Sequence, residues 1–168
     1  MNSIARLFKR YFLNCFVLML PVLIWNIIFS SKLPENYQPE VFLRDIPDFI
    51  TYGENASRLV LFVIAYLMPL HISTKREQIG LSIYLAGLLL YFVSWSILIY
   101  FPKSIWSTTV VGFSAPAYLP AIWIAGISLL GNSFYFNLPF RRWIFITAAI
   151  IFLAFHISHT IMVYDALN

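Results

Sequence analysis

The chain has 168 residues, of which 61% are hydrophobic and only 11% are charged, and its mean hydropathy is +0.80. An ordinary soluble domain has about 25% charged residues, so this chain cannot cover itself with polar surface and is expected to use lipid as its solvent. The net charge of +4 does not indicate a nucleic-acid partner, because the basic residues lie in short clusters between apolar runs, where they orient helices against a membrane. We therefore predict an all-α integral membrane protein that contacts membrane lipids and no nucleic acid.

Five apolar segments predict a single membrane domain, a five-helix transmembrane bundle. The expected spans are residues 11–31, 56–72, 79–101, 117–130 and 143–164, with residues 32–55 forming an outer loop. The expected location is the inner cell membrane, as a multi-pass protein. Other membrane subunits or further copies of the chain are possible partners.

The first apolar segment follows a basic cluster, Arg6, Lys9 and Arg10. It is longer than the ~7–15 residues of a signal-peptide core and no clean cleavage site follows it, so we expect it to be retained as the first span. Pro21 near its middle removes one backbone hydrogen bond and predicts a kink. Asn26 is a polar group that needs a partner inside a bundle.

The outer loop holds five of the seven acidic residues: Glu35, Glu40, Asp45, Asp48 and Glu54. Within it Phe42, Ile46 and Phe49 have the spacing of one helical face, which predicts a short helix on the bilayer surface. Pro47 interrupts this pattern, so the alternative is an irregular loop anchored by aromatic side chains.

The second span begins at residue 56 only if Arg58 lies within it with a snorkelling side chain. Residues 73–78 are expected to form a tight basic turn before the third span, which has no charged residue.

The fourth span has no clear beginning, because residues 104–140 carry no charge. Its helix can begin anywhere from residue 110 to 117, and Pro116 and Pro120 predict an irregular or kinked start. Small residues recur every four positions along it and predict a close helix contact. These residues are Ala117, Ala121 and Ala125.

The distribution of Lys and Arg predicts the orientation, because basic residues favour the cytoplasmic side. With the amino terminus inside, seven basic residues fall on the inner side: Arg6, Lys9, Arg10, Lys75, Arg76, Arg141 and Arg142. Four fall on the outer side: Lys32, Arg44, Arg58 and Lys103. We therefore expect the amino terminus inside and the carboxyl terminus outside.

A polar layer is expected where several spans approach the outer side. At a rise of about 1.5 Å per residue, Asn26, Arg58, His156 and His159 lie at similar depth, and Glu54 lies one helical turn above Arg58. Ionisable groups within a membrane normally face the bundle interior or a wet cavity. These five residues are the candidate ligand-binding residues. The alternative is that Arg58 extends to lipid headgroups while the histidines satisfy each other and nearby serines.

No metal site and no catalytic residue is predicted, and the sequence identifies no cofactor. His156 and His159 at i, i+3 can supply two metal ligands and Glu54 a third, but Asp165 points to the opposite side of its helix and His71 lies at the other membrane face. The single cysteine, Cys15, has no partner for a disulfide or metal knuckle.

One pattern resembles fragments of the CAAX-type intramembrane proteases: Glu54 with Arg58 as Glu-x-x-x-Arg, and Phe152 with His156 as Phe-x-x-x-His. The chain departs from that family because Gly53 replaces the first of the paired glutamates and no His-x-x-x-Asn follows. The chain is therefore not assigned to it.

Two classes of function remain. The first is a small multi-pass membrane protein that uses the outward-facing polar layer to bind or pass a small solute or lipid headgroup, or that serves as a subunit of a membrane assembly. The alternative is an outer-leaflet membrane enzyme that acts on a lipid-linked substrate. The first is favoured because the sequence shows no complete acid/base constellation and no nucleophile.

Overall fold

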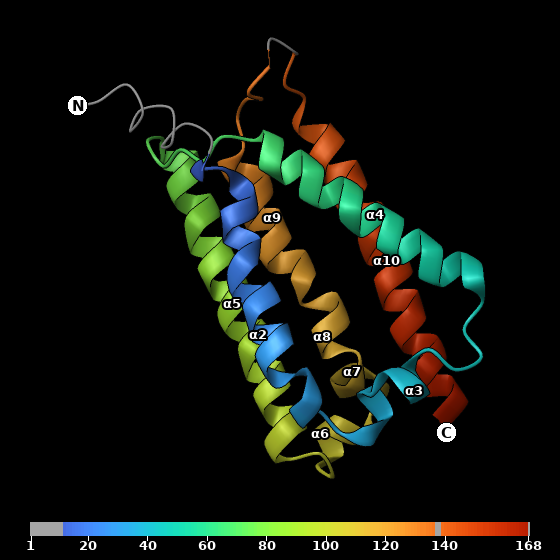
Figure 1. Ribbon diagram of the computed structural model, residues 1–168. Coiled ribbons are helices and arrows are strands. Elements are labelled where there is room, and N and C mark those ends of the chain that lie inside the picture. The colour runs from blue at the N-terminus through green and yellow to red at the C-terminus, as the bar shows by residue number, and fades with distance from the viewer. Residues whose placement is uncertain (1–11, 137–138, 168) are drawn as a thin grey trace.

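The computed structural model describes residues 12–136 and 139–167, which are helical and contain no β-strand beyond an isolated bridge between Asn14 and Pro69 (Figure 1). Three segments are long and apolar enough to cross a membrane: Cys15–Lys32, Lys75–Tyr100 and Arg142–Leu167. The chain is therefore an all-helical protein with the character of a membrane protein. The basic cluster of Arg6, Lys9 and Arg10, and the first residue of the expected first span, Tyr11, lie outside the described residues.

The first apolar segment is a succession of helix types. A 3-10 turn, η1 (Cys15–Met19), leads into α2 (Leu20–Phe29), and η2 (Ser30–Lys32) ends the segment. Pro21 lies in the first turn of α2, where a proline is tolerated because its missing N–H has no partner in the helix. The helix type therefore changes just before Pro21, between Met19 and Leu20, and Pro21 does not lie in the middle of one continuous α-helix; the kink itself stays a prediction.

The polar loop contains only short turns, η3 (Glu35–Tyr37) and α3 (Pro39–Phe42). The helix expected to join Phe42, Ile46 and Phe49 does not form, because Asp45 has a φ of 56° in the left-handed region, which a continuing helix excludes.

Helix α4 (Asp48–Leu67) begins eight residues before the expected second span, so the prediction that residues 48–55 are loop is wrong. Pro47 precedes its first turn and Asp48 supplies a negative charge there, which favours a helix start. The helix ends at Leu67 because Met68 precedes Pro69 and takes an extended conformation. Residues 68–72 were expected to be helical and are not.

Helix α5 (Lys75–Tyr100) begins inside the expected basic turn, so the prediction of a turn at residues 73–78 is wrong. Thr74 and Glu77 form a capping box: the Thr74 side chain accepts from the backbone of Glu77, and the Glu77 carboxylate accepts from the backbone of Thr74. This arrangement satisfies the N–H groups that a helix start leaves unpaired.

The predicted fourth span, residues 117–130, and the segment before it form a series of short helices rather than one long helix. They are α6 (Ile105–Thr108), α7 (Val110–Phe113), α8 (Ala115–Tyr118) and α9 (Pro120–Leu130). Pro116 and Pro120 each lie in the first turn of a helix, so each proline marks a new start, as the sequence predicts.

The last helix, α10 (Arg142–Leu167), lies close to its predicted bounds. Arg142 at its start binds the end of α9: Nε donates to the carbonyl oxygen of Ser128 at 2.7 Å and Nη2 to that of Gly131 at 3.2 Å. These bonds satisfy carbonyl groups that the end of a helix leaves without partners.

Helices α5 and α9 pack backbone to backbone through glycines. A β-carbon at Gly126 would lie 2.5 Å from the backbone nitrogen of Tyr84, and one at Gly87 would lie 2.5 Å from that of Trp123. The predicted contact through the alanine stripe is wrong, because Ala121 and Ala125 are exposed. The close contact lies on another face of α9, which Gly126 occupies.

Helices α4 and α10 form the second close pair, and α2 lies with α5 and α9 on the other side (Figure 1). The buried positions of α4 recur every three or four residues and form one face toward the interior. They are Ile50, Glu54, Ser57, Leu61 and Ala65. Glu54, a polar member of this face, places an acidic group between α4 and α10.

The glycine contact between α5 and α9 generates the first prediction. Gly126→Leu should lower the free energy of unfolding by about 1–3 kcal/mol, because an added side chain meets backbone of α5 that cannot move aside. Ala125→Leu is the matched control, since this neighbouring residue is exposed and its substitution should have little effect. Thermal unfolding in detergent compares the two. Equal stability would show that α5 and α9 are not in close contact.

Candidate functional site

The side chain of Glu54 joins α4 to α10. Its carboxylate forms an ion pair with Arg58 one turn along α4. It is also hydrogen-bonded across the helix pair: Oε1 lies 3.0 Å from Nδ1 of His156, and Oε2 lies 2.7 Å from Nδ1 of His159. We call these four residues the Glu54 cluster. Spacings of i, i+4 in α4 and i, i+3 in α10 place each pair on one helical face.

The hydrogen bonds of His159 show that this cluster holds an extra proton. Its Nε2 lies 3.0 Å from the carbonyl oxygen of Phe42, which can only accept, and its Nδ1 faces a Glu54 oxygen. A neutral imidazole has one N–H, so either His159 is an imidazolium ion or Glu54 is a carboxylic acid that donates to Nδ1. In both cases Glu54 and His159 together are electrically neutral.

The guanidinium of Arg58 therefore has a positive charge that no anion of the cluster fully opposes. Nη2 binds Glu54, Nη1 donates to Oδ1 of Asn55 at 3.2 Å, and the carbon Cζ lies 5.7 Å from the centre of the Phe152 ring. An arginine has five N–H groups, so several donors remain after these contacts. The side chain is 36% exposed, whereas that of Glu54 is 8% exposed.

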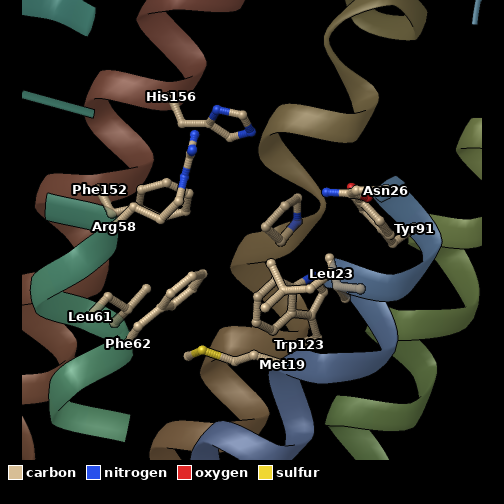
Figure 2. Close-up of a pocket in the computed structure, with 12 residues that line it drawn as sticks. Met19, Leu23, Asn26, Arg58, Leu61, Phe62, Tyr91, Trp123, Phe152 and His156 are labelled. Atoms are coloured by element: carbon tan, nitrogen blue, oxygen red, sulfur yellow. The ribbon is translucent and has the colours of Figure 1, made fainter. Parts of the chain in front are cut away.

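The remaining donors of Arg58 face a cavity of about 170 Å³ between the two groups of helices. Figure 2 shows Arg58 and His156 together on one wall, with Asn26 and Tyr91 on the opposite wall. Tyr91 donates to Oδ1 of Asn26 at 2.7 Å, and this is the partner that the sequence requires for Asn26. Met19, Leu61 and Phe62 form part of the apolar end of this first cavity (Figure 2).

A second cavity, of about 200 Å³, adjoins the first. Both are lined by Asn26, Tyr91 and His156, so the polar side chains lie at the junction. The second cavity continues toward the polar loop, where Tyr37 and Phe42 line it. Burial raises the pKa of the Tyr37 hydroxyl, so this side chain is uncharged at neutral pH.

All five predicted binding residues lie around this one region. Glu54, Arg58 and His156 are in direct contact, His159 contacts Glu54 behind them, and Asn26 lies across the cavity. The alternative arrangement is not present: Arg58 pairs with Glu54, and both histidines bind this carboxylate rather than each other. Within residues 12–136 and 139–167 no group of three His, Cys, Asp or Glu side chains is arranged to hold a metal ion.

Tyr91 and Trp123 are among the residues of the first cavity that were not predicted. Both are buried aromatic residues on helices rich in other aromatic residues, and membrane-protein aromatics are first expected at the interfaces. The signal that could identify Tyr91 is its hydroxyl, which needs a partner when buried. Asn26 is the polar residue that meets this requirement.

No known protein family, curated protein or solved structure matches this chain. Its function is therefore inferred from the chemistry of the Glu54 cluster and the two cavities.

The buried carboxylate generates the second prediction. Glu54→Leu should lower the free energy of unfolding by about 3–5 kcal/mol, because Arg58, His156 and His159 then lose their common hydrogen-bond partner whichever of the two groups carries the proton. Glu40→Leu, at an exposed position, is the control. Thermal unfolding of both variants provides the measurement, and unchanged stability of Glu54→Leu would contradict the role of this side chain in holding α4 to α10.

Proposed function

We propose that this protein is a multi-pass protein of the inner cell membrane that binds or passes a small anionic solute, or the anionic headgroup of a lipid, in the first cavity. The observation that carries this proposal is the Arg58 guanidinium at the cavity wall, because its counter-ion Glu54 is shared with His156 and His159. Arginine presents a planar fork of donors that fits carboxylate and phosphate groups.

The low polarity of the surroundings strengthens this interaction. Charges attract more strongly where water is scarce, and the cavity is mainly lined by apolar side chains. An anion in the cavity would find a positive charge that is already oriented, since Glu54, Asn55 and Phe152 hold the guanidinium in place. Preorganisation of this kind reduces the entropy lost on binding.

In the proposed membrane arrangement five segments span the bilayer, with the amino terminus inside and the carboxyl terminus outside. The basic pair Lys75 and Arg76 at the start of α5 and the pair Arg141 and Arg142 beside the start of α10 support this orientation. The two cavities then lie toward the outer leaflet, with the loop that contains Phe42 above them. Assembly with other membrane subunits or with further copies is compatible with this arrangement.

One observation favours a second function, that of an outer-leaflet enzyme acting on a lipid-linked substrate. Glu54 accepts from Nδ1 of His156 and so orients the imidazole, whose other nitrogen is turned toward the cavity (Figure 2). A histidine held in this way can act as a general base. Turnover of a total lipid extract, followed by mass spectrometry and abolished by His156→Gln, would favour the enzyme over a binding protein.

The third prediction tests the orientation. A reporter that is active only in the cytoplasm should give no signal when fused after Asn168, because the bias of basic residues places this end outside. The same reporter fused within the chain beside Lys75 is the positive control. A strong cytoplasmic signal from the carboxyl-terminal fusion would reject the proposed orientation.

The fourth prediction tests the binding site itself. Arg58→Gln should weaken the binding of butyrate or butyl phosphate by roughly 10- to 100-fold, the effect of losing a charge-assisted hydrogen bond worth about 1.5–3 kcal/mol. Titration calorimetry on the purified protein measures the affinity. Arg44→Gln, on the exposed part of the loop, is the matched control. Equal binding by the two variants would show that Arg58 is not the anion site.

A further inference from the structure

Two other charged side chains on the helices are fully used by the fold. The carboxylate of Glu77 accepts from the backbone of Ser73 and Thr74 and from the amide of Asn132. Arg142 donates to two carbonyl groups at the end of α9. Arg58 differs from both, because its unused donors face an empty space rather than a partner in the protein.

The polar end of the first cavity offers mainly donors. Oδ1 of Asn26 accepts from Tyr91, which leaves its Nδ2 end turned into the cavity (Figure 2). The indole Nε1 of Trp123 is also buried without a hydrogen-bond partner within the described part of the chain, but this ring lies beside Leu23 and Met19, at the apolar end (Figure 2). No acidic residue is among those described as lining this cavity. A buried donor without a partner is costly, so these groups favour a ligand that supplies several acceptor oxygens.

The other end of the same cavity is lined by aliphatic and aromatic groups, among them Met19, Val22, Leu23, Leu61 and Phe62. Such a lining favours an alkyl chain, because methionine and leucine side chains adapt to a flexible apolar guest. A cavity of about 150 Å³ in another protein accommodates benzene. The 170 Å³ of the first cavity therefore suits a group of roughly six carbon atoms, provided that the headgroup lies at the junction and extends into the adjoining second cavity of about 200 Å³.

We infer that the ligand is a single-chain anionic amphiphile. Its carboxylate or phosphate binds at Arg58 and Asn26, and the first methylenes of its alkyl chain occupy the apolar end of the first cavity. This inference rests on the proposed anion site and adds the alkyl chain to it. Both a free fatty acid and a lipid phosphate have this chemistry.

The experiment compares alkyl carboxylates from butyrate to dodecanoate with the corresponding alkyl phosphates, on the full chain held in an amphipathic polymer without micelles. Each dissociation constant is calculated from the concentration of free ligand in the aqueous phase. Each methylene that enters the cavity should increase affinity about fourfold, the equivalent of ~0.8 kcal/mol per buried methylene. The increase should end at about six to eight carbons, whereas partition into the polymer would continue to rise with chain length.

Leu23→Phe fills the apolar end and should abolish the increase in affinity with chain length beyond butyrate. Ile27→Phe is the matched control, since this residue lies four positions further along α2 and is 79% exposed. Val22→Phe is a second filling variant in case Leu23→Phe does not fold, and the melting temperature of each variant checks its fold. The series that binds more tightly identifies the headgroup as carboxylate or phosphate.

The outcomes separate the two proposals. Butyrate or butyl phosphate binding that depends on Arg58, without any gain from longer chains, would overturn the alkyl-chain inference and leave the anion site in place. A gain that does not end, or that Leu23→Phe does not change, would also overturn it. Absence of Arg58-dependent binding for every short anion would overturn the proposed function, and the inference with it.

Discussion

The arrangement of the site depends on one buried carboxylate. Glu54 joins α4 to α10 through Arg58, His156 and His159, and two of these contacts cross between the helices. Breaking a buried ionic group leaves uncompensated charge in a medium of low polarity, which is strongly unfavourable. The carboxylate therefore fixes the relative positions of the two helices more firmly than apolar contacts can in lipid, where apolar surface gains little from association.

The other helix pair is held by a different interaction. Gly87 and Gly126 allow the backbones of α5 and α9 to come close, and dense packing of this kind leaves no internal space. The cavities lie between the two pairs, where Pro120 at the start of α9 and Asn26 of α2 line the first cavity, and Pro116 of α8 and Asn26 line the second. The position of the site thus follows from the contrast between a close glycine contact and a polar ionic contact.

The sequence was sufficient to predict the helical class and the residues of the polar layer, but not the contacts among them. Arg58, His156 and His159 are identified as site residues because ionisable side chains cost free energy to insert into a membrane and are rare there. Their partner Glu54 was predicted, but the segment before residue 56 was assigned to a loop, because apolar runs define spans by composition and α4 begins with polar residues. The position of a residue along a helix gives its depth in the membrane but not the rotation of the helix about its axis. The face of α9 that contacts α5 was therefore assigned to the alanines, whereas it contains Gly126.

Boundaries were the weakest part of the prediction, for reasons that lie in individual side chains. The capping box of Thr74 and Glu77 extends α5 into a segment that charge alone marks as a turn. Pro69 ends α4 within an apolar run, because a proline disfavours helix at the residue before it. Local backbone chemistry therefore overrides hydropathy at helix ends, whereas hydropathy is sufficient in the middle of a span.

The charge of the Glu54 cluster connects stability with binding. When Glu54 and His159 share one extra proton, they neutralise each other, and the charge of Arg58 remains in a region with little water. Holding the net positive charge of the cluster there costs free energy, so the protein without an anion should be less stable than the protein with one. A ligand that binds only the folded state stabilises that state in proportion to its concentration and affinity. The residue that makes the cavity attractive to an anion is therefore also the residue through which the anion would stabilise the fold.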